Sequence, residues 1–392
     1  MRNHQDDPMK SYDILLKNGL IFDSESNIIK KSDIAIKNNL ISSVSPSIDK
    51  EEASKCFDVS GKYVLPGLID MHVHVWWGVA HLSLDVDTTS LGRGVPVVVD
   101  AGSSGSNTVD GFNRYVVKPS TSKILAFLNI SGMGQLDNDI GELEDIRWAR
   151  VSKAVDAAKT HKDFIVGIKV RLSNHIVGAN DLIALKRSIE AAEHLKMPLM
   201  IHIGNTNHSL DSIIGKLRSG DIVTHSFHGL SKGIMDNTGK IIDVVRDARD
   251  RGVNFDVGHG AGSFSFNIAE KALENGFPPN TISSDLHKYN IDSPVFDLCT
   301  TMSKYFNMGV SLEDVFSMST ISPAKILNIS GEFGIIRENI EANITVLNEE
   351  SGTFIFIDAM GEEKSGNKRL VPCLLVRGGK IHGILPHTSK NY

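Results

Sequence analysis

Cysteine is scarce in this sequence. Three residues, Cys56, Cys299 and Cys373, stand far apart in a chain of 392. No two of them have the close spacing of a thiolate zinc site, and three scattered thiols do not make a disulfide framework. We therefore expect neither a disulfide-stabilised scaffold nor a cysteine-bound metal, and we expect a reducing, cytoplasmic setting.

Long hydrophobic runs and strong charge are also missing. No stretch of about 18 apolar residues occurs, so no membrane-spanning helix is expected. The polar residues 1–13 lack the apolar core of a secretion signal. The formal net charge is -6, and no Lys/Arg stripe supplies the field that nucleic acid or an anionic membrane would need. The composition favours a soluble protein whose partner is a small molecule.

Both ends of the chain alternate between short apolar strands and turns. Residues 12–64 contain Asn18-Gly19 and Asn38-Asn39 between apolar runs, and residues 331–392 contain Gly378-Gly379 in a similar setting. Such dipeptides are typical of hairpin turns. We expect these two ends to form one small β-sandwich, with a larger domain inserted between them.

The middle of the chain, residues 65–330, alternates short apolar runs with amphipathic segments, of which 143–161 and 181–195 have the clearest helical period. Continuous apolar runs are typical of strands buried on both faces, and strands separated by helices pair in parallel. Eight such units predict an α/β protein with a (β/α)8 TIM-like barrel, which needs about 250 residues. The eight runs are LIDMHVHV, VPVVVDAGS, ILAFLNIS, FIVGIKVRL, PLMIHIG, DIVTHSF, NFDVGHG and TISSDLH.

Ionisable side chains stand near the ends of five of these runs, where barrels of this kind carry their functional groups. The period of two along a strand places two imidazoles of the first run on one face, so both can bind one metal ion. A single histidine in an apolar run is more often a hydrogen-bonded core residue, but the whole set in this order favours metal ligands. The set is His72, His74, Lys169, His202, His225 and Asp285.

Lys169 needs a separate argument, because a protonated lysine beside two cations would be repelled. Burial lowers the pKa of a lysine, and the neutral amine can add carbon dioxide. The resulting carbamate is an anionic ligand with two oxygens that can bridge two metals. The alternative is a lysine that pairs with a carboxylate such as Asp285 at an empty or single-metal site.

The segments that carry these residues resemble the metal-binding strands of the amidohydrolase superfamily, in the binuclear branch with a carboxylated lysine. The resemblance is closest to its amidohydrolase/deacetylase subgroup, which is dihydroorotase-like or D-aminoacylase-like, and it covers nearly the whole chain. The segments are VLPGLIDMHVH, GIKVR, MIHIG, VTHSF and ISSDLH.

The resemblance implies a role for each ligand. His72 and His74 would hold the buried metal together with Asp285, and His202 and His225 would hold the outer one. Carboxylated Lys169 would bridge the two ions. Zinc suits such an imidazole-rich site best, while manganese, iron and nickel stay open. A homo-oligomer is expected on the same analogy.

The reaction implied by this resemblance is hydrolysis of an amide or ester bond. Two metals would lower the pKa of a shared water and give a bridging hydroxide that attacks the substrate carbonyl. Asp285 would accept the proton and pass it to the leaving group. We expect deacetylation of a small N-acyl or O-acyl molecule that bears a carboxylate.

Substrate contacts are harder to predict from the sequence. Arg171 follows Lys169 by two residues, so it lies on the same side of the strand and can bind a substrate carboxylate or pair with a nearby acid. His259 and Tyr289 are further candidates for substrate contact, as is His287 near the mouth. Trp76-Trp77, directly after the histidine pair, either wall the pocket or pack beneath the first loop, and packing is favoured.

Several other functions remain as alternatives. Dihydroorotases typically place an arginine shortly after the histidine pair, where this chain has Val75-Trp76-Trp77. Adenosine-type deaminases carry a glutamate three residues after the third histidine, where this chain has Asn205. A cyclic amidase is therefore the second choice, with a phosphotriesterase or lactonase also open. A non-catalytic scaffold is least favoured, because such relatives usually lose ligands.

Overall fold

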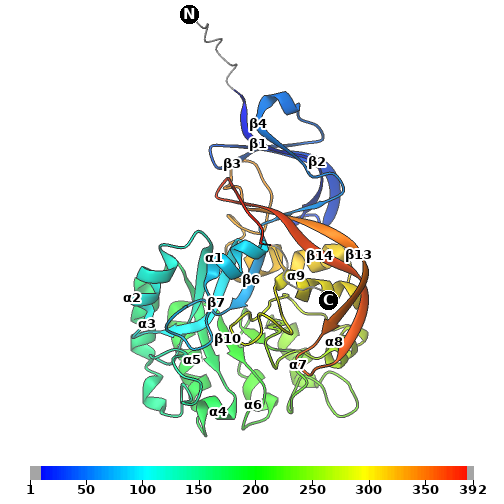
Figure 1. Cartoon of the computed structure of the whole chain (residues 1–392). Helices are drawn as coiled ribbons and strands as arrows, with labels where there is room; N and C mark the ends of the chain where they lie inside the picture. Colours follow the sequence, from blue (N-terminus) through cyan, green and yellow to red (C-terminus); the bar gives the residue numbers. More distant parts are fainter. Residues whose placement is uncertain (1–9, 386–392) are drawn as a thin grey trace, which may run out of the picture.

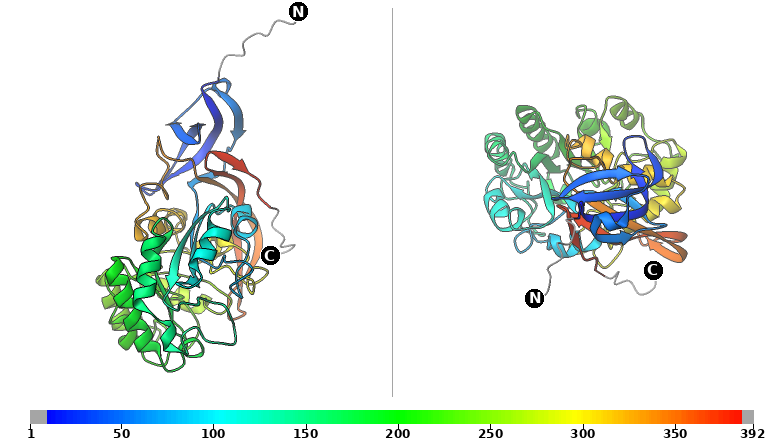
Figure 2. Two further views of the ribbon diagram at one scale, coloured as in Figure 1. Left: turned by 90° about the vertical axis from the view of Figure 1, so that its left-hand side faces the viewer. Right: turned by 90° about the horizontal axis from the view of Figure 1, so that it is seen from above.

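The computed structural model describes residues 10–385 and has two parts. Parallel strands surrounded by helices form the lower part of Figure 1, and a second sheet stands above them. Seen from the side, this second sheet extends beyond one end of the lower part (Figure 2). Residues 1–9, which make up most of the segment examined for a secretion signal, and residues 386–392 lie outside the described part of the chain.

Seven parallel strands follow one another around the lower sheet in chain order. They form where the sequence has continuous runs of valine, isoleucine and leucine, and their side chains are almost all buried on both faces, as the pattern predicts. The strands are β6 (Ile69–Val73), β7 (Val97–Gly105), β8 (Lys123–Asn129), β9 (Ile165–Arg171), β10 (Leu199–His202), β11 (Ile222–Thr224) and β12 (Asn254–Phe255).

The segment 281–286 closes the ring between β12 and β6. Thr281 forms a parallel bridge with Asp256, next to β12, and Leu286 forms a parallel bridge with Val73 at the end of β6. The segment stays irregular because Asp285 has a left-handed backbone (φ 49°) that interrupts a regular strand. The eighth run therefore occupies the eighth position of the barrel, and the predicted TIM-like fold is confirmed.

Helices lie between the barrel strands. The predicted segment 181–195 is helical throughout, whereas helix α3 begins only at Val151, because the preceding residues 146–148 form a separate 3-10 turn capped by Asp145. The α-helices are α1 (Val86–Thr89), α2 (Val109–Phe112), α3 (Val151–Thr160), α4 (Asn174–Val177), α5 (Asp181–Leu195), α6 (Leu210–Ile214), α7 (Asp243–Asp250), α8 (Phe266–Glu274), α9 (Leu298–Asn307), α10 (Leu312–Met318) and α11 (Ile321–Ile326).

Both ends of the chain build the second sheet, as predicted. β5 joins the two halves, because it pairs in parallel with β1 and antiparallel with β13. It also crosses the domain boundary predicted after residue 64. The strands are β1 (Tyr12–Asp23), β2 (Ile28–Lys37), β3 (Leu40–Ser45), β4 (Ala53–Asp58), β5 (Tyr63–Pro66), β13 (Ile344–Ile357), β14 (Glu363–Arg377) and β15 (Lys380–His382).

The long hairpin of β13 and β14 connects this sheet to the barrel. It runs down beside α9 in Figure 1. The Leu370 N–H donates to the hydroxyl of Ser303 on α9 (2.9 Å), and the Asn307 amide donates to the Lys368 carbonyl (2.7 Å). The sheet is therefore attached to the barrel wall through polar contacts, one of them buried, as well as apolar packing.

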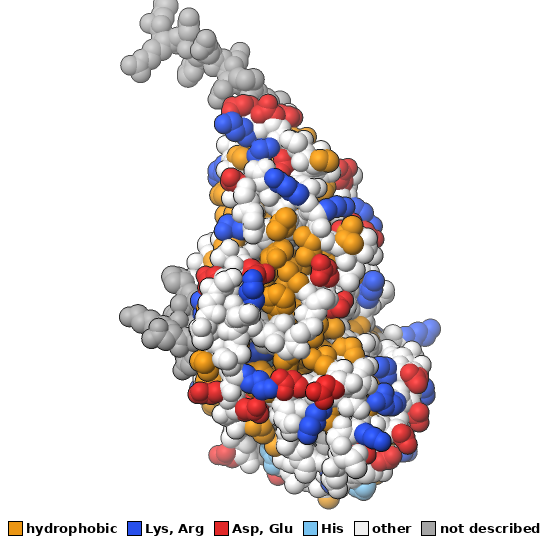
Figure 3. Space-filling view, turned by 90° about the vertical axis from the view of Figure 1, so that its right-hand side faces the viewer, with side chains coloured by type: hydrophobic (Ala, Val, Ile, Leu, Met, Phe, Trp, Pro, Cys, Tyr) orange, Lys and Arg blue, Asp and Glu red, His pale blue; other side chains and the backbone are white. Residues whose placement is uncertain are grey.

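One face of the molecule shows how its charged side chains are distributed. On the face drawn in Figure 3, basic and acidic side chains are mixed around an apolar strip, without a broad basic area. Within residues 10–385, no helix has both the length and the apolar composition needed to cross a membrane.

Candidate metal centre

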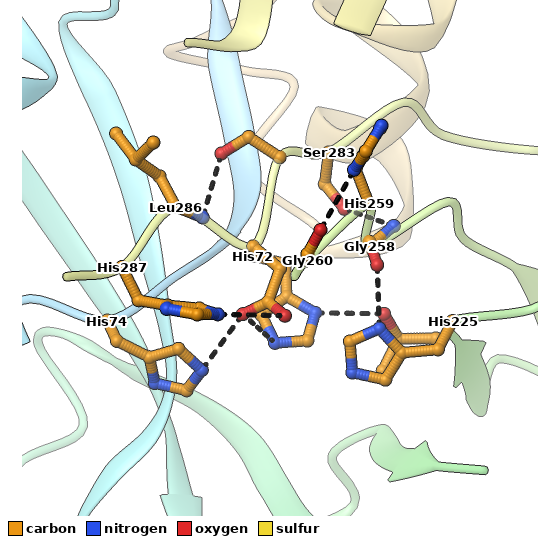
Figure 4. Close-up of polar contacts among 12 residues, drawn as sticks. His72, His74, His225, Gly258, His259, Gly260, Ser283, Leu286 and His287 are labelled. Carbon is orange, nitrogen blue, oxygen red and sulfur yellow. Dashed lines mark hydrogen bonds and ion pairs between the residues drawn. The ribbon is translucent and has the colours of Figure 1, made fainter. Parts of the chain in front are cut away.

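All six side chains predicted as metal ligands line one cavity of about 160 Å³ at the C-terminal ends of the barrel strands. Five of them are buried and His202 is partly exposed. In Figure 4, the rings of His72, His74 and His225 lie around a common centre, with His287 beside them. The barrel thus brings together residues that are more than 200 positions apart in the sequence.

The two imidazoles at the end of β6 share one carboxylate oxygen. The Nε2 atoms of His72 and His74 lie 3.3 and 3.1 Å from Oδ1 of Asp285. Their Nδ1 atoms face away, toward the Thr224 hydroxyl (2.8 Å) and the Ser103 hydroxyl (2.9 Å). A histidine held through one ring nitrogen presents the other in a fixed direction, which is the usual arrangement around a bound metal.

His225 is held in the same way. Its Nδ1 donates to the Gly258 carbonyl (2.6 Å), so the lone pair of the neutral ring lies on Nε2. The backbone of His225 is left-handed (φ 62°), which is rare for a residue other than glycine. Such strain concentrates at functional sites, and here it turns the ring from the end of β11 toward the cavity.

His202 presents the opposite ring nitrogen. The Ser173 hydroxyl donates to the Gly204 carbonyl (2.6 Å) and therefore accepts from Nε2 of His202 (3.1 Å). The lone pair of the neutral His202 ring then lies on Nδ1. The rings of His202 and His225 are 4.3 Å apart, so their free nitrogens can serve the same ion.

Burial keeps these imidazoles neutral. Desolvation lowers the pKa of His74 and of His225 to about 3, and it holds the pKa of His72 and of His202 well below the usual value. Neutral imidazole is the form that binds metal ions. The four rings are therefore ready to act as ligands throughout the physiological pH range.

Asp285 completes this group. Its Oδ1 is buried and has no hydrogen-bond donor among residues 10–385. A Cβ atom on Gly260 would lie 2.5 Å from its Oδ2, so only glycine leaves room for the carboxylate. A buried carboxylate oxygen without a donor is costly unless a cation compensates it.

Lys169 reaches the same cavity from β9 and is fully buried. Burial lowers the pKa of its amine to about 7, a shift that Asp285 and other acids only partly oppose. A fraction of the lysine is thus neutral near pH 7 and able to react with carbon dioxide.

The donor set fits divalent cations. One ligand atom each from His72, His225 and Asp285 lies within 4.8 Å of the other two. Two further neutral imidazoles and an amine that can be carboxylated line the same cavity. Nitrogen and carboxylate ligands of this kind suit zinc.

Behind the rings lies a hydrogen-bonded layer that the sequence analysis missed. Thr224 accepts from His72 and donates to Asp256 (2.7 Å), which also accepts from the hydroxyls of Thr281 and Ser283. The only sequence signal is that Thr224 directly precedes His225. Because this network spans β6, β11 and β12, it fixes the orientation of His72.

Comparison with known proteins decides the family. The family model described as "Amidohydrolase family" matches residues 63–367, well over half of the chain. This chain belongs to the amidohydrolase family. The resemblance inferred from the metal-binding strands is therefore confirmed.

Relatives in the family carry different names. A protein named deacetylase from Brucella anthropi is 32% identical over 88% of this chain and 86% of its own. A second deacetylase, from Enterococcus faecalis, is 32% identical over 95% of this chain and 99% of its own. Solved structures titled as an adenine deaminase and a dihydroorotase are 30% and 31% identical, each with a TM-score of 0.88. They cover 95% of this chain and 100% and 99% of their own.

Arg171 pairs with a nearby acid, which is one of the two roles considered for it, and its binding of a substrate carboxylate stays a prediction. It lines the cavity, and its Nη1 donates to Oε1 of Glu142 (2.6 Å). Glu142 lies in the loop after β8, just before the helix predicted from 143, and no sequence pattern distinguished it.

The structure does not bring His259 or Tyr289 to the lining of this cavity. His259 is fully buried, its Nδ1 bonded to the Gly260 carbonyl (3.0 Å) and its Nε2 to Lys304 (2.7 Å). Tyr289 is exposed and contacts His81 through its hydroxyl (3.3 Å). His259 therefore supports the loop beneath the cavity, and Tyr289 lies outside it.

The two tryptophans after the histidine pair differ in burial. Trp76 is buried and packs on Phe112, with ring centres 5.8 Å apart, as favoured from the sequence. Trp77 is exposed. His287 does line the cavity, with its Nε2 4.0 Å from Oδ2 of Asp285.

Lys304 is a buried amine outside the cavity. Its amine donates to three acceptors: Nε2 of His259 and the carbonyls of Pro294 (2.9 Å) and Ile357 (2.6 Å). It thus connects α9, the loop at His259 and the end of β13. Burial lowers its pKa to about 7, although Asp358 partly opposes the shift.

This pKa predicts a pH dependence of stability. Between pH 7 and about 10.4, the unfolded lysine binds a proton that the folded one has lost. The unfolding free energy should therefore rise with pH in this window, by up to about 1.4 kcal/mol per unit from this group. Urea unfolding of wild type and Lys304→Met should show the steeper slope in wild type. The exposed substitution Lys271→Met should keep the wild-type slope, and equal slopes in all three proteins would contradict the assignment.

Proposed function

We propose that this amidohydrolase is a metal-dependent hydrolase that removes a small acyl group, acetyl above all, from a small carboxylate-bearing molecule. The observation that carries the proposal is the meeting of four neutral imidazoles, Lys169 and Asp285 in one buried cavity. Asp285 Oδ1, without a donor among residues 10–385, supports cation binding at this point.

The ligand assignment is part of this proposal. His72 and His74 would hold an inner ion with Asp285, and His202 and His225 would hold an outer ion. Lys169, carboxylated on its amine, would be a ligand to both. We propose zinc for both ions, because imidazole-rich sites favour it. When bound, a pair of divalent cations acidifies water and polarises a carbonyl group.

Asp285 then moves the proton. Its carboxylate takes a proton from the attacking water and gives it to the departing nitrogen or oxygen. The left-handed backbone at Asp285 and the glycine at Gly260 keep this carboxylate directed into the cavity. His287 faces the second oxygen of Asp285 and adds a polar group on the outer side.

Deacylation is favoured over the activities named for the two solved structures. Adenosine-type deaminases usually carry a glutamate where this chain has Asn205, and dihydroorotases typically place an arginine where this chain has Val75-Trp76-Trp77. The relatives named deacetylase cover most of this chain and of their own length. A cavity of about 160 Å³ also favours a small substrate.

A cyclic amidase is the second candidate. The structure titled as a dihydroorotase is 31% identical over nearly the whole chain, which keeps this reaction open. Assays with dihydroorotate and hydantoins beside N-acetyl amino acids and O-acetyl hydroxy acids separate the two candidates. Turnover of the cyclic amides alone would replace the deacylase proposal. A cytoplasmic location and a homo-oligomer remain predictions for this enzyme.

Metal content tests the centre itself. Protein produced with added zinc and bicarbonate should contain two metal ions per chain, measured by elemental analysis. Removal of the metal by a chelator should abolish hydrolysis, and added zinc with bicarbonate should restore it. Less than one ion per chain after zinc loading would favour the non-catalytic scaffold instead.

A further inference from the structure

Gln135 is a buried polar side chain that nothing in the described chain satisfies. Its side chain lines the cavity, and only 1% of the residue is exposed. Neither Oε1 nor Nε2 has a hydrogen-bond partner among residues 10–385. A buried amide without partners costs free energy, so its orientation toward the cavity indicates a ligand group that bonds to it.

The backbone holds Gln135 in place. Its N–H donates to the Ser103 carbonyl at the end of β7 (3.0 Å), and its carbonyl accepts from the N–H of His81 (3.2 Å). The preceding Gly134 has a left-handed backbone (φ 69°), and any Cβ there would collide with the Ser103 carbonyl. The amide is thus directed by a fixed segment, which is the arrangement that ligand recognition requires.

Arg171 on β9 lines the same cavity and is equally constrained. Its Nη1 bonds to Oε1 of Glu142, and Oε2 of Glu142 accepts from the Asn129 amide (2.7 Å). Both oxygens of Glu142 are therefore occupied by the protein. The guanidinium of Arg171 makes no other hydrogen bond among residues 10–385, so most of its N–H groups are available to a ligand.

The free polar groups of these cavity-lining residues are mainly donors. Arg171 contributes several N–H groups and Gln135 contributes two, against a single acceptor at Gln135 Oε1. His287 adds another donor, because its Nδ1 accepts from the Tyr289 N–H (3.2 Å), which leaves the proton of the neutral ring on Nε2. A lining rich in free donors fits a ligand group rich in acceptors, and a carboxylate accepts planar, paired hydrogen bonds from arginine.

We propose that Gln135 and Arg171 together form a subsite for the substrate's own carboxylate. This carboxylate belongs to the alcohol or amine half of the substrate, not to the acyl group. This inference rests on the proposed deacylase function and names the group that it recognises. Gln135 is a specificity-determining residue here, since its amide donates to the carboxylate while Glu142 holds Arg171 in place. Oε1 of Gln135 accepts from an N–H or O–H of the ligand.

Matched substrate pairs test this subsite. O-acetyllactate and O-acetyllactamide differ only in carboxylate against carboxamide, as do N-acetylalanine and N-acetylalaninamide. Wild type should prefer the carboxylate member in kcat/KM by about 10- to 100-fold, the range expected for one or two charge-assisted hydrogen bonds. In Gln135→Met and Arg171→Met this preference should fall toward one, mainly through KM of the carboxylate member.

Gln135→Glu gives the sharpest variant, because it keeps the size of the side chain and adds a negative charge. The preference should then reverse in favour of the carboxamide. Arg147→Met is the matched control, since Arg147 forms an exposed pair with Asp145 and should keep the wild-type preference. Circular dichroism and metal content of each variant check the fold. An unchanged preference in the three Gln135 and Arg171 variants would overturn the subsite.

The same experiments distinguish a failure of this subsite from a failure of the proposed deacylase function. If wild type hydrolyses neither member of any pair, the deacylase proposal fails. Calorimetric titration of zinc-loaded protein with lactate and with lactamide then tests the subsite directly. Binding of lactate that weakens about 10-fold or more in Gln135→Met supports it, and equal binding of both compounds to wild type contradicts it.

Discussion

Replacement of Asp285 by asparagine is expected to lower kcat by at least about 10³-fold, within the range that general acid–base catalysis contributes. The variant should still bind metal, because the amide oxygen of asparagine can occupy the place of Oδ1. What it loses is the ability to take up a proton and release it again. Steady-state kinetics with the best acetylated substrate, together with elemental analysis of the same protein, measures both parts of the expectation.

The geometry explains why the loss should be so large. Oδ1 of Asp285 lies within 3.3 Å of the Nε2 atoms of both His72 and His74, and Oδ2 lies 4.0 Å from His287. Since burial keeps these imidazoles neutral, with pKa values well below the physiological range, they are poor substitutes as bases. No other carboxylate lines the cavity in the described chain.

A nearby control separates this effect from general damage. Asp292 is exposed and lies seven positions further along, so Asp292→Asn should leave kcat and metal content unchanged. Near-normal turnover of Asp285→Asn would remove Asp285 from proton transfer. Loss of metal together with activity would assign it to metal binding alone.

Lys169→Ala is expected to cause the second large loss, with metal content below two ions per chain and activity reduced at least about 100-fold. Even an indirect partner of a metal ligand contributes 10- to 100-fold to metal affinity or activity, and a bridging ligand should contribute more. The methyl side chain also leaves a void in the most enclosed part of the cavity, where the lysine is 1% exposed.

Chemical rescue distinguishes the carbamate from an ordinary lysine. A small carboxylate such as formate or acetate can enter the void in Lys169→Ala and supply the missing anionic oxygens, so added carboxylate should restore part of the metal content and activity. Lys186→Ala, at an exposed position on α5, is the control and should resemble wild type. Full activity of Lys169→Ala without any additive would exclude a bridging role.

Much of the barrel could be predicted because its strands are local features of the sequence. Each continuous apolar run forms a strand or, at 281–286, a segment that bridges two strands. The reason is that a strand buried on both faces of a parallel sheet needs apolar side chains at consecutive positions. The start of α3 was predicted too early because apolar periodicity continues through 143–150, whereas Asp145 caps a separate turn there. Side-chain capping is a local competition that periodicity does not describe.

In the candidate site, too, some residues could be predicted from the sequence and others could not. The histidines and Asp285 follow apolar runs, so strand ends alone predicted that they would meet. Gln135 and Glu142 lie in the loop after β8, where no periodic pattern fixes a side-chain direction. Only the folded chain shows that Gln135 lines the cavity and that Glu142 bonds to Arg171. His259 follows an apolar run as the metal ligands do, but its ring bonds to Lys304 from another helix, a contact that no sequence spacing reveals.

The position of β5 in the second sheet has a consequence for synthesis of the chain. During translation β1 to β5 emerge early, yet β13, the neighbour that covers the open side of β5, is made nearly 280 residues later. Until then one row of backbone hydrogen-bonding groups on β5 has no partner from its own chain, and such an edge can pair with another molecule. A nascent chain that stalls before residue 344 is therefore expected to be prone to aggregation even when its barrel segments are complete.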